Sequence, residues 1–270
     1  MQILGLDDNQ ITTVGDMSHL PLKRLELASN QLSELTGDFL PASLVELWVD
    51  YNQLTRLTNI SHTSLIDLSV DDNNLTEVRG DFLPVSLVKL FMSDNQLTRL
   101  GDLSHTSLTE LSVRDNELTE VWGDFLPASL EMLEMYNNQL TRLANFSHTS
   151  LKRLSVFNNE LTEVRGDDLP VSLVRLEIYN NKLTSLGNLS HLSHMKQLEV
   201  QNNQLTEINE HYLPESLQTL FLYGNPLSKT VNLTHLVSLT QLYVSNTDCQ
   251  QYRQMLPNVR VYNSYLYLCP

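Results

Sequence analysis

The 270-residue sequence has few cysteines, few basic residues and no long apolar run, and each shortage excludes a class of protein. Two cysteines, Cys249 and Cys269, are too few for the disulfide framework of a small secreted domain. Only 17 basic residues stand against 32 acidic ones. A net charge of -15 repels phosphate backbones, so we expect no nucleic-acid partner. No run of about 18 apolar residues occurs, so we expect no membrane insertion.

The two ends of the chain give little information about the cellular compartment of the protein. Residues 1–6 lack the basic stretch and apolar core of a secretory signal peptide, so we expect a soluble protein, cytosolic or exported by another route. Met1 begins within a strand pattern and has no polar cap before it, which indicates either a truncated chain or a short first repeat. We interpret Cys249 and Cys269 as free thiols. The alternative is a disulfide that closes the C-terminal end and implies an oxidising compartment.

An asparagine recurs at steps of 21 or 22 residues from Asn9 to Asn225, and Thr247 stands at the next step. The pattern before it is Leu-x-x-Leu-x-Leu/Val/Met-x-x-Asn, as in residues 65–73. The alternation over residues 68–70 has the period of a strand, so alternate side chains point into a core and out to solvent. We expect the asparagine to be buried and to satisfy backbone groups where the chain turns.

This pattern resembles the signature of the leucine-rich-repeat superfamily over nearly the whole chain. The resemblance implies a leucine-rich-repeat solenoid with a curved parallel sheet on its concave face. Repeats of this length leave no room for a long helix, so the convex face is expected to hold turns, extended chain and short 3₁₀ segments. We expect about twelve repeats over residues 1–247 and a C-terminal cap over residues 248–270. Residues 248–256 are predicted to form a short helix with Asp248 at its N-terminus.

Two frames alternate to give a 43-residue unit. One frame contains Leu40-Pro41-Ala42-Ser43-Leu44 and resembles the repeats of bacterial secreted effectors of the YopM and IpaH type. The other frame, as in residues 97–107, is similar to internalin-like repeats. The effector resemblance implies a host protein as partner. No acid, base and nucleophile stand out from the repeated frame, and no sequence remains for a catalytic domain, so we expect no enzyme and no cofactor.

A row of histidines and a row of alternating charges could be taken for functional sites, but we interpret both rows as structural. His62, His105 and His148 recur two repeats apart, which is about 10 Å along the stack, whereas zinc ligands converge on one ion. We therefore expect no metal site, and each histidine should bond to its own turn. Acidic pairs such as residues 71–72 lack an EF-hand loop. A ladder of surface ion pairs that fixes register is predicted for Glu77, Arg99, Glu120, Arg142 and Glu163.

Comparing the repeats with one another separates copied positions from variable ones. Turn and convex positions are nearly copied, whereas outward-facing strand positions differ at almost every step. Random sequence drift on a solvent-exposed face would give Lys, Glu, Ser and Thr. Aromatic residues recur at these outward-facing positions instead, which indicates a recognition surface. The candidate partner-binding residues are Glu46, Trp48, Asp50, Tyr51, Asp67, Asp71, Asp72, Lys89, Phe91, Arg114, Tyr136, Arg153, Phe157, Arg175, Glu177, Tyr179, Phe221, Tyr223 and Tyr243.

The predicted face has an acidic first half and a nearly neutral second half that is rich in aromatic residues. Our hypothesis is that the acidic half attracts a basic segment of a protein or peptide partner, while the aromatic half supplies affinity. Two alternatives stay open. One is a carbohydrate-binding surface, because aromatic rings and amides also suit sugars. The other is a structural or engineered scaffold without a natural ligand. We expect the protein itself to be a monomer.

Overall fold

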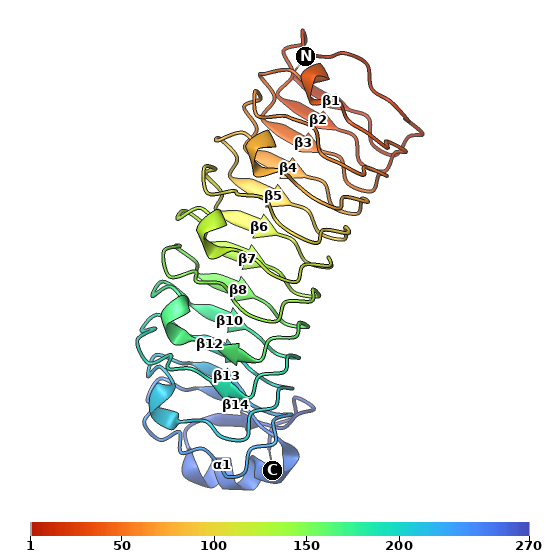
Figure 1. Ribbon diagram of the computed structural model, residues 1–270. Coiled ribbons are helices and arrows are strands. Elements are labelled where there is room, and N and C mark those ends of the chain that lie inside the picture. The colour runs from red at the N-terminus through yellow and green to blue at the C-terminus, as the bar shows by residue number, and fades with distance from the viewer. Residues whose placement is uncertain (1, 270) are drawn as a thin grey trace. The chain divides into compact units, whose positions relative to one another are not determined.

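The structure is a computed structural model that describes residues 2–269, so the interpretation of Met1 lies outside the described residues. The chain divides into two compact units, Met1–Gln139 and Leu140–Pro270. Each unit is a parallel β-solenoid in which every turn adds one short strand beside the strand of the previous turn (Figure 1). The predicted fold class is thereby confirmed as a parallel solenoid with very little helix.

The strands of the first unit pair in chain order, in parallel and in register, so that Leu25, Leu47 and Leu68 lie side by side. Each strand has three residues, of which the central one points into the core in β2 to β7. The strands are β1 (Ile3–Gly5), β2 (Arg24–Glu26), β3 (Glu46–Trp48), β4 (Asp67–Ser69), β5 (Lys89–Phe91), β6 (Glu110–Ser112) and β7 (Met132–Glu134).

The second unit repeats this arrangement, with Leu154, Leu176 and Leu198 side by side. Its main sheet contains β8 (Arg153–Ser155), β10 (Arg175–Glu177), β12 (Gln197–Glu199), β13 (Thr219–Phe221), β14 (Gln241–Tyr243) and β15 (Arg260–Tyr262). Two shorter strands, β9 (Glu163–Val164) and β11 (Ser185–Leu186), form a separate parallel pair.

The return side of alternate turns carries short 3₁₀ segments, as the repeat length predicted. Each segment is followed by a buried leucine and a proline, which end the 3₁₀ geometry. Gly80, which opens the second segment, approaches the next turn so closely that an added Cβ would lie 1.7 Å from the carbonyl oxygen of Asp102. The segments are η1 (Gly37–Phe39), η2 (Gly80–Phe82), η3 (Gly123–Phe125), η4 (Gly166–Asp168) and η5 (Glu210–Tyr212).

The recurrent asparagines from Asn30 to Asn203 are buried and serve the backbone of two turns at once, as predicted. Asn73 is typical: its Nδ2 donates to the carbonyls of Val49 (3.0 Å), Val70 (3.2 Å) and Asp71 (3.0 Å). Its Oδ1 accepts from the N–H of Leu54 at 2.9 Å. Four backbone groups that would otherwise be buried without partners are thereby satisfied.

The histidine and charge rows are structural, with one correction. The Nε2 atoms of His62 and His105 lie 3.0 and 3.2 Å from the carbonyl oxygens of Leu40 and Leu83. These carbonyls belong to the turn 22 residues earlier, so the expectation of a bond within the same turn was wrong. Glu77 and Arg99 form the predicted ion pair between turns at 2.5 Å.

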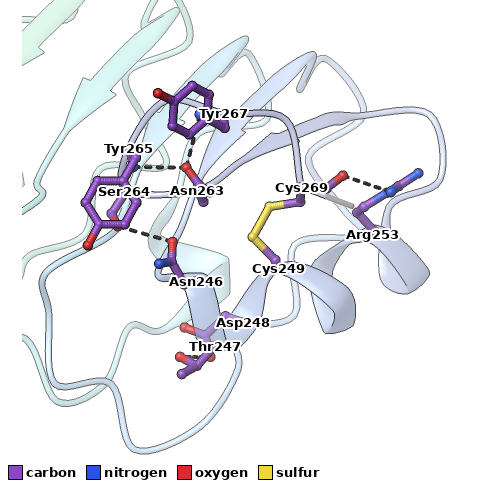
Figure 2. Close-up of a disulfide and its surroundings, with 10 residues drawn as sticks. All are labelled: Asn246, Thr247, Asp248, Cys249, Arg253, Asn263, Ser264, Tyr265, Tyr267 and Cys269. Atoms are coloured by element: carbon purple, nitrogen blue, oxygen red, sulfur yellow. Dashed lines mark hydrogen bonds between the residues drawn. A yellow bond between two sulfur atoms is a disulfide. The ribbon is translucent and has the colours of Figure 1, made fainter.

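The C-terminal residues contain η6 (Asn246–Asp248) and α1 (Cys249–Met255), so the predicted short helix is present. Asp248 occupies its N-cap position, although its side chain makes no capping hydrogen bond. Cys249 and Cys269 form a disulfide with their Cα atoms 5.5 Å apart (Figure 2). The interpretation of these cysteines as free thiols was therefore wrong. Between residues 2 and 269, no helix is both long and apolar enough to span a bilayer.

Candidate functional site

The candidate site is the solvent face of each sheet, which we define as the strand positions that point away from the core together with the two residues at the following turn. All of the predicted partner-binding residues lie on this face, because side chains alternate along each strand. The two units differ in charge. The first holds 22 acidic and 7 basic side chains, and the second holds 10 of each, so the whole net charge of the chain resides in the first unit.

Trp48 is the large aromatic side chain at the start of this face. The guanidinium carbon of Arg24 lies 3.8 Å from its ring centroid, which is a cation–π distance. Glu26 and Glu46 hold the same guanidinium at 2.7 and 3.2 Å. The ring is therefore fixed in place by the turn before it, and Arg24 is a member of the face that the sequence-based list lacks.

An acidic patch, which we define as Asp50, Asp67, Asp71, Asp72 and Asp94, follows on the next turns. Two of these carboxylates also bridge neighbouring turns. Asp50 Oδ1 accepts from the Ser69 hydroxyl at 2.5 Å and from the N–H of Asp71 at 2.9 Å. Asp71 Oδ1 in turn accepts from the N–H of Ser93 at 2.5 Å. These bonds hold the patch rigid, although its charges repel one another.

Burial makes this patch costly to ionise. Desolvation raises the pKa of Asp71 to about 6, with a smaller contribution from the Asp50 carboxylate, although the hydrogen bond from Ser93 acts in the opposite direction. The pKa values of Asp67 and Asp94 are raised for the same principal reason. The Asp67 Oδ1 atom is buried and accepts no hydrogen bond from the described part of the chain. The patch therefore favours an added cation or hydrogen-bond donor.

Backbone geometry gives some of these acidic residues a second role. The residue before each buried asparagine has a left-handed backbone, with φ of 52° at Asp72, 53° at Asp94 and 54° at Asp115. Asp and Asn tolerate this conformation better than most residues. The equivalent Tyr51 adopts it too, with φ of 53° and a 61% exposed side chain. Tyr51 has no such backbone preference, so it is the stronger candidate for a contact residue.

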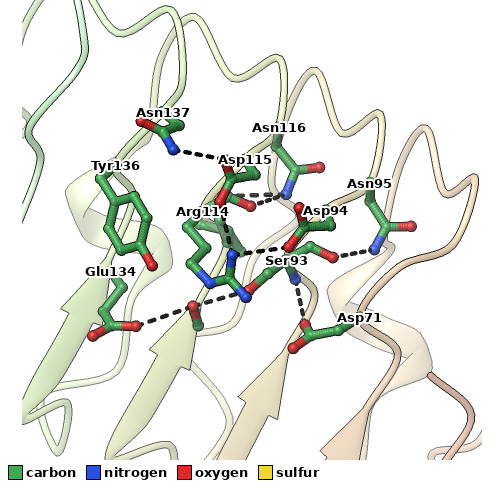
Figure 3. A network of polar contacts seen from close by, with 12 residues as sticks. Asp71, Ser93, Asp94, Asn95, Arg114, Asp115, Asn116, Glu134, Tyr136 and Asn137 are labelled. Atoms are coloured by element: carbon green, nitrogen blue, oxygen red, sulfur yellow. Dashed lines mark hydrogen bonds and ion pairs between the residues drawn. The ribbon is translucent and has the colours of Figure 1, made fainter. Parts of the chain in front are cut away.

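Arg114 links the acidic patch to the last strand of the first unit (Figure 3). Its Nη1 lies 2.9 Å from Asp94 and 2.8 Å from Asp115, and its guanidinium carbon is 5.9 Å from the ring centroid of Tyr136. Asn137 Nδ2 donates to Asp115 at 2.6 Å. Arg114 is thus held by two carboxylates and positions its neighbours.

A polar ridge, which we define as Arg153, Ser155, Arg175, Glu177 and Glu199, opens the face of the second unit. Glu177 is only 5% exposed and accepts from Arg153 Nε at 3.0 Å, from Arg175 Nη2 at 2.6 Å and from the Ser155 hydroxyl. Arg175 also reaches Glu199 at 2.9 Å. Glu177 lies on the predicted face but is covered, so it positions the two arginines.

Stacked aromatic rings occupy other positions of the same face. Phe157 and Tyr179 stack with centroids 4.4 Å apart and planes 7° from parallel. A second stack joins Phe221, Tyr243 and Tyr262, with successive centroid distances of 4.0 and 4.7 Å. Rings stacked in this way cover one another's faces and leave their edges uncovered by the stack, and the Tyr243 hydroxyl donates to Gln241 Oε1 at 3.2 Å.

Gln201 marks the gap in this aromatic pattern, because the equivalent residues of the neighbouring turns are Tyr179 and Tyr223. It is buried, and its Oε1 accepts no hydrogen bond from residues 2–269, while its Nε2 donates to Glu199 at 3.4 Å. Burial also raises the pKa of Tyr223. Gln201 therefore presents an unsatisfied acceptor among rings.

Solved structures resemble the chain over nearly its whole length. An internalin of Listeria monocytogenes is 21% identical with a TM-score of 0.76, and the match covers 97% of this chain and 79% of the other. A leucine-rich-repeat protein of Leptospira interrogans is 22% identical with a TM-score of 0.63, covering 97% and 83%. The chain therefore has the fold of a leucine-rich-repeat solenoid.

The leucine-rich effector YopM from Yersinia pestis is also similar to this leucine-rich-repeat chain. It is 29% identical with a TM-score of 0.62, and the match covers 92% of this chain and 63% of YopM. No protein-family model and no curated protein matches the sequence. The likeness is therefore one of fold, and the residues on the solvent face have to carry any argument about function.

Sequence reasoning did not place Arg24 and Tyr262 on this leucine-rich-repeat face. Tyr262 follows Tyr243 by 19 residues instead of 21 or 22, so it falls outside the repeat frame. The alternation Arg260-Val261-Tyr262 was the available signal, because it matches the strand pattern of the other turns. Within the described range, no group of three His, Cys, Asp or Glu side chains is placed to hold a metal ion.

Proposed function

We propose that this leucine-rich-repeat protein is a binding module that holds a protein or peptide partner on the solvent face of its sheet. One observation carries the proposal. Consecutive strands present aromatic and charged side chains that vary from turn to turn, on a frame whose core and return side are nearly copied. A constant scaffold under a variable, aromatic-rich face is the arrangement that recognition requires. An exposed aromatic residue without a function would lower solubility.

The first unit favours a basic partner segment. Its surplus of acidic side chains attracts cations over a distance, and burial raises the pKa values of Asp67 and Asp71, so an added positive charge would stabilise their ionised forms. A lysine or arginine of the partner placed at the patch would offset the cost of burying these charges. Complementary charge of this kind mainly accelerates association.

The second unit favours a protein surface over a sugar. Carbohydrate sites place the face of an aromatic ring against the apolar side of a sugar, but the rings of Phe157, Tyr179, Phe221 and Tyr243 stack on one another. The ring edges that remain suit side chains of a protein partner. We infer no enzyme activity, because the carboxylates of the polar ridge are held by arginines on an open sheet surface.

The experiment is capture by the immobilised full chain, compared with two variants. Replacing Phe157, Tyr179 and Tyr136 by Ala removes rings from the face, and a control replaces the exposed return-side residues Val85 and Val171 by Ser. Circular dichroism and thermal unfolding first establish that all three proteins are folded. If the effector resemblance holds, extracts of host cells supply the partner.

A protein retained by the wild type and by the control, but lost by the triple variant, would support the proposal. Cross-linking of that protein to the solvent face would then locate it. Equal capture by all three proteins would contradict the proposal. Retention on a glycan array without any captured protein would favour the sugar-binding alternative instead.

A further inference from the structure

The segment 263–269 displays four consecutive large apolar side chains to solvent. Tyr265, Leu266, Tyr267 and Leu268 are 69, 60, 70 and 61% exposed. At other places between residues 2 and 269, exposed large apolar side chains stand singly along the sequence. We call these four residues the apolar loop. A concentrated apolar patch of this kind is costly in water and marks a surface that meets something apolar.

The backbone N–H groups of Tyr265, Leu266 and Tyr267 in the apolar loop are paired within the protein. Asn263 Oδ1 accepts from the N–H groups of Tyr265 at 2.9 Å and Tyr267 at 3.0 Å. The N–H of Leu266 donates to the Asn263 carbonyl at 2.9 Å, and the Asn263 N–H donates to the Tyr267 carbonyl at 2.8 Å. These three N–H groups can meet an apolar medium without losing a hydrogen-bond partner.

The apolar loop is also held at both ends. The Cys249–Cys269 disulfide ties it to α1, and Arg253 Nη1 donates to the Cys269 carbonyl at 2.8 Å (Figure 2). The Ser264 hydroxyl donates to Asn246 at 3.3 Å. Leu266 has a left-handed backbone with φ of 65°, which a bulky residue seldom adopts. The four side chains are thus presented in one conformation, so little entropy is lost on contact.

We propose that the apolar loop is a contact site for the surface of an uncharged lipid bilayer, into which its two leucines and two tyrosines insert while the solenoid stays in water. Tyrosine prefers the boundary between headgroups and acyl chains, and leucine prefers the acyl chains. The expectation of no membrane insertion came from the lack of a spanning segment, but a surface contact needs none.

The exposed area of the apolar loop and the charge of the unit that carries it favour a zwitterionic bilayer over a protein partner. Four side chains at this exposure present on the order of 450 Å², about half of what each partner of a stable protein dimer buries. A bilayer needs no matching surface. The second unit, which carries the loop, holds 10 acidic and 10 basic side chains, so it has no net positive charge to attract anionic lipids and a zwitterionic bilayer is sufficient.

Flotation of the full, oxidised chain with phosphatidylcholine vesicles tests the proposal. The loop variant carries Tyr265→Ser, Leu266→Asn, Tyr267→Ser and Leu268→Ser, with Asn chosen because it tolerates the left-handed backbone. The matched control carries Val85→Ser, Val171→Ser and Val237→Ser, which remove exposed apolar side chains elsewhere. Thermal unfolding establishes that both variants are folded.

We expect the wild type and the control to float and the loop variant to lose at least about tenfold in vesicle partitioning. Adding phosphatidylserine to the vesicles should not strengthen the binding of the wild type, because the second unit has no net positive charge. The proposal is wrong if the wild type stays in solution at millimolar lipid, or if the loop variant floats equally well. It is also overturned if sedimentation shows a dimer that the loop variant abolishes without any flotation, because a second copy would then cover the patch.

Discussion

The hydroxyl oxygen of Tyr252 in α1 accepts a hydrogen bond from the backbone N–H of Val231 at 3.1 Å. Tyr252 is 2% exposed, and burial raises its pKa to about 12. The helix is thereby joined to the turn before it through a buried donor that has few other partners within reach. The contact connects the C-terminal residues to the repeats by more than apolar packing.

Tyr252→Phe should therefore lower the free energy of unfolding by about 1–2 kcal/mol, because the Val231 N–H would be left buried without an acceptor. Tyr212, which is exposed, provides the control, and Tyr212→Phe should change stability by less than about 0.5 kcal/mol. Urea unfolding of both variants measures the difference. Equal stabilities would mean that the hydroxyl contributes nothing at this contact.

Asp71 should make the stability of the first unit depend on pH. Its pKa is about 6 in the folded chain and near 3.8 when unfolded, so the folded state binds the proton more tightly. The resulting stabilisation is complete below pH 3.8 and is lost as the pH rises through 6. Asp71→Asn removes this dependence and can still accept from the Ser93 N–H through its amide oxygen.

We expect Asp71→Asn to raise the free energy of unfolding at pH 7.5 by about 1–2 kcal/mol, less than the full pKa shift implies because the carboxyl is partly solvated. At pH 4 the variant and the wild type should differ little. Chemical unfolding at both pH values measures this. A stabilisation of the same size at pH 4 would contradict the assignment of the effect to a buried charge.

Gly80 tests how closely neighbouring turns approach on the return side. A Cβ there would overlap the Asp102 carbonyl, whereas a Cβ on Gly15 would meet no atom within 4 Å. Gly80→Ala should therefore destabilise the protein by about 3 kcal/mol or more, as expected for a side chain that forces backbone apart. Gly15→Ala should be neutral or slightly stabilising, because Ala restricts the unfolded chain. Similar unfolding midpoints for the two variants would show that the turns separate easily.

The repeated frame predicted the features that recur in every turn. Leu68 is buried and Asn73 bonds to the backbone of two turns because one period sets both positions. Features that depend on contacts between turns were not predictable in this way. Glu177 is covered because Arg153 and Arg175 of neighbouring strands converge on it. The pairing of the two cysteines likewise depends on a distance that their separation of 20 residues does not determine.

The polar ridge gives a last prediction, because its charges are buried while similar pairs elsewhere are exposed. Arg175 holds Glu177 and Glu199, whose side chains are only 6% and 10% exposed. Arg175→Met would leave these carboxylates short of positive charge, and we expect a loss of about 2–4 kcal/mol. Lys182 pairs with Glu160 at 3.0 Å, with both side chains about half exposed. Lys182→Met should cost less than about 0.5 kcal/mol.

Thermal and chemical unfolding of the two variants at pH 7 measure the difference in their stabilities. If Arg175→Met were as stable as Lys182→Met, Arg153 alone would be sufficient to hold Glu177, and Arg175 would be available to a partner instead.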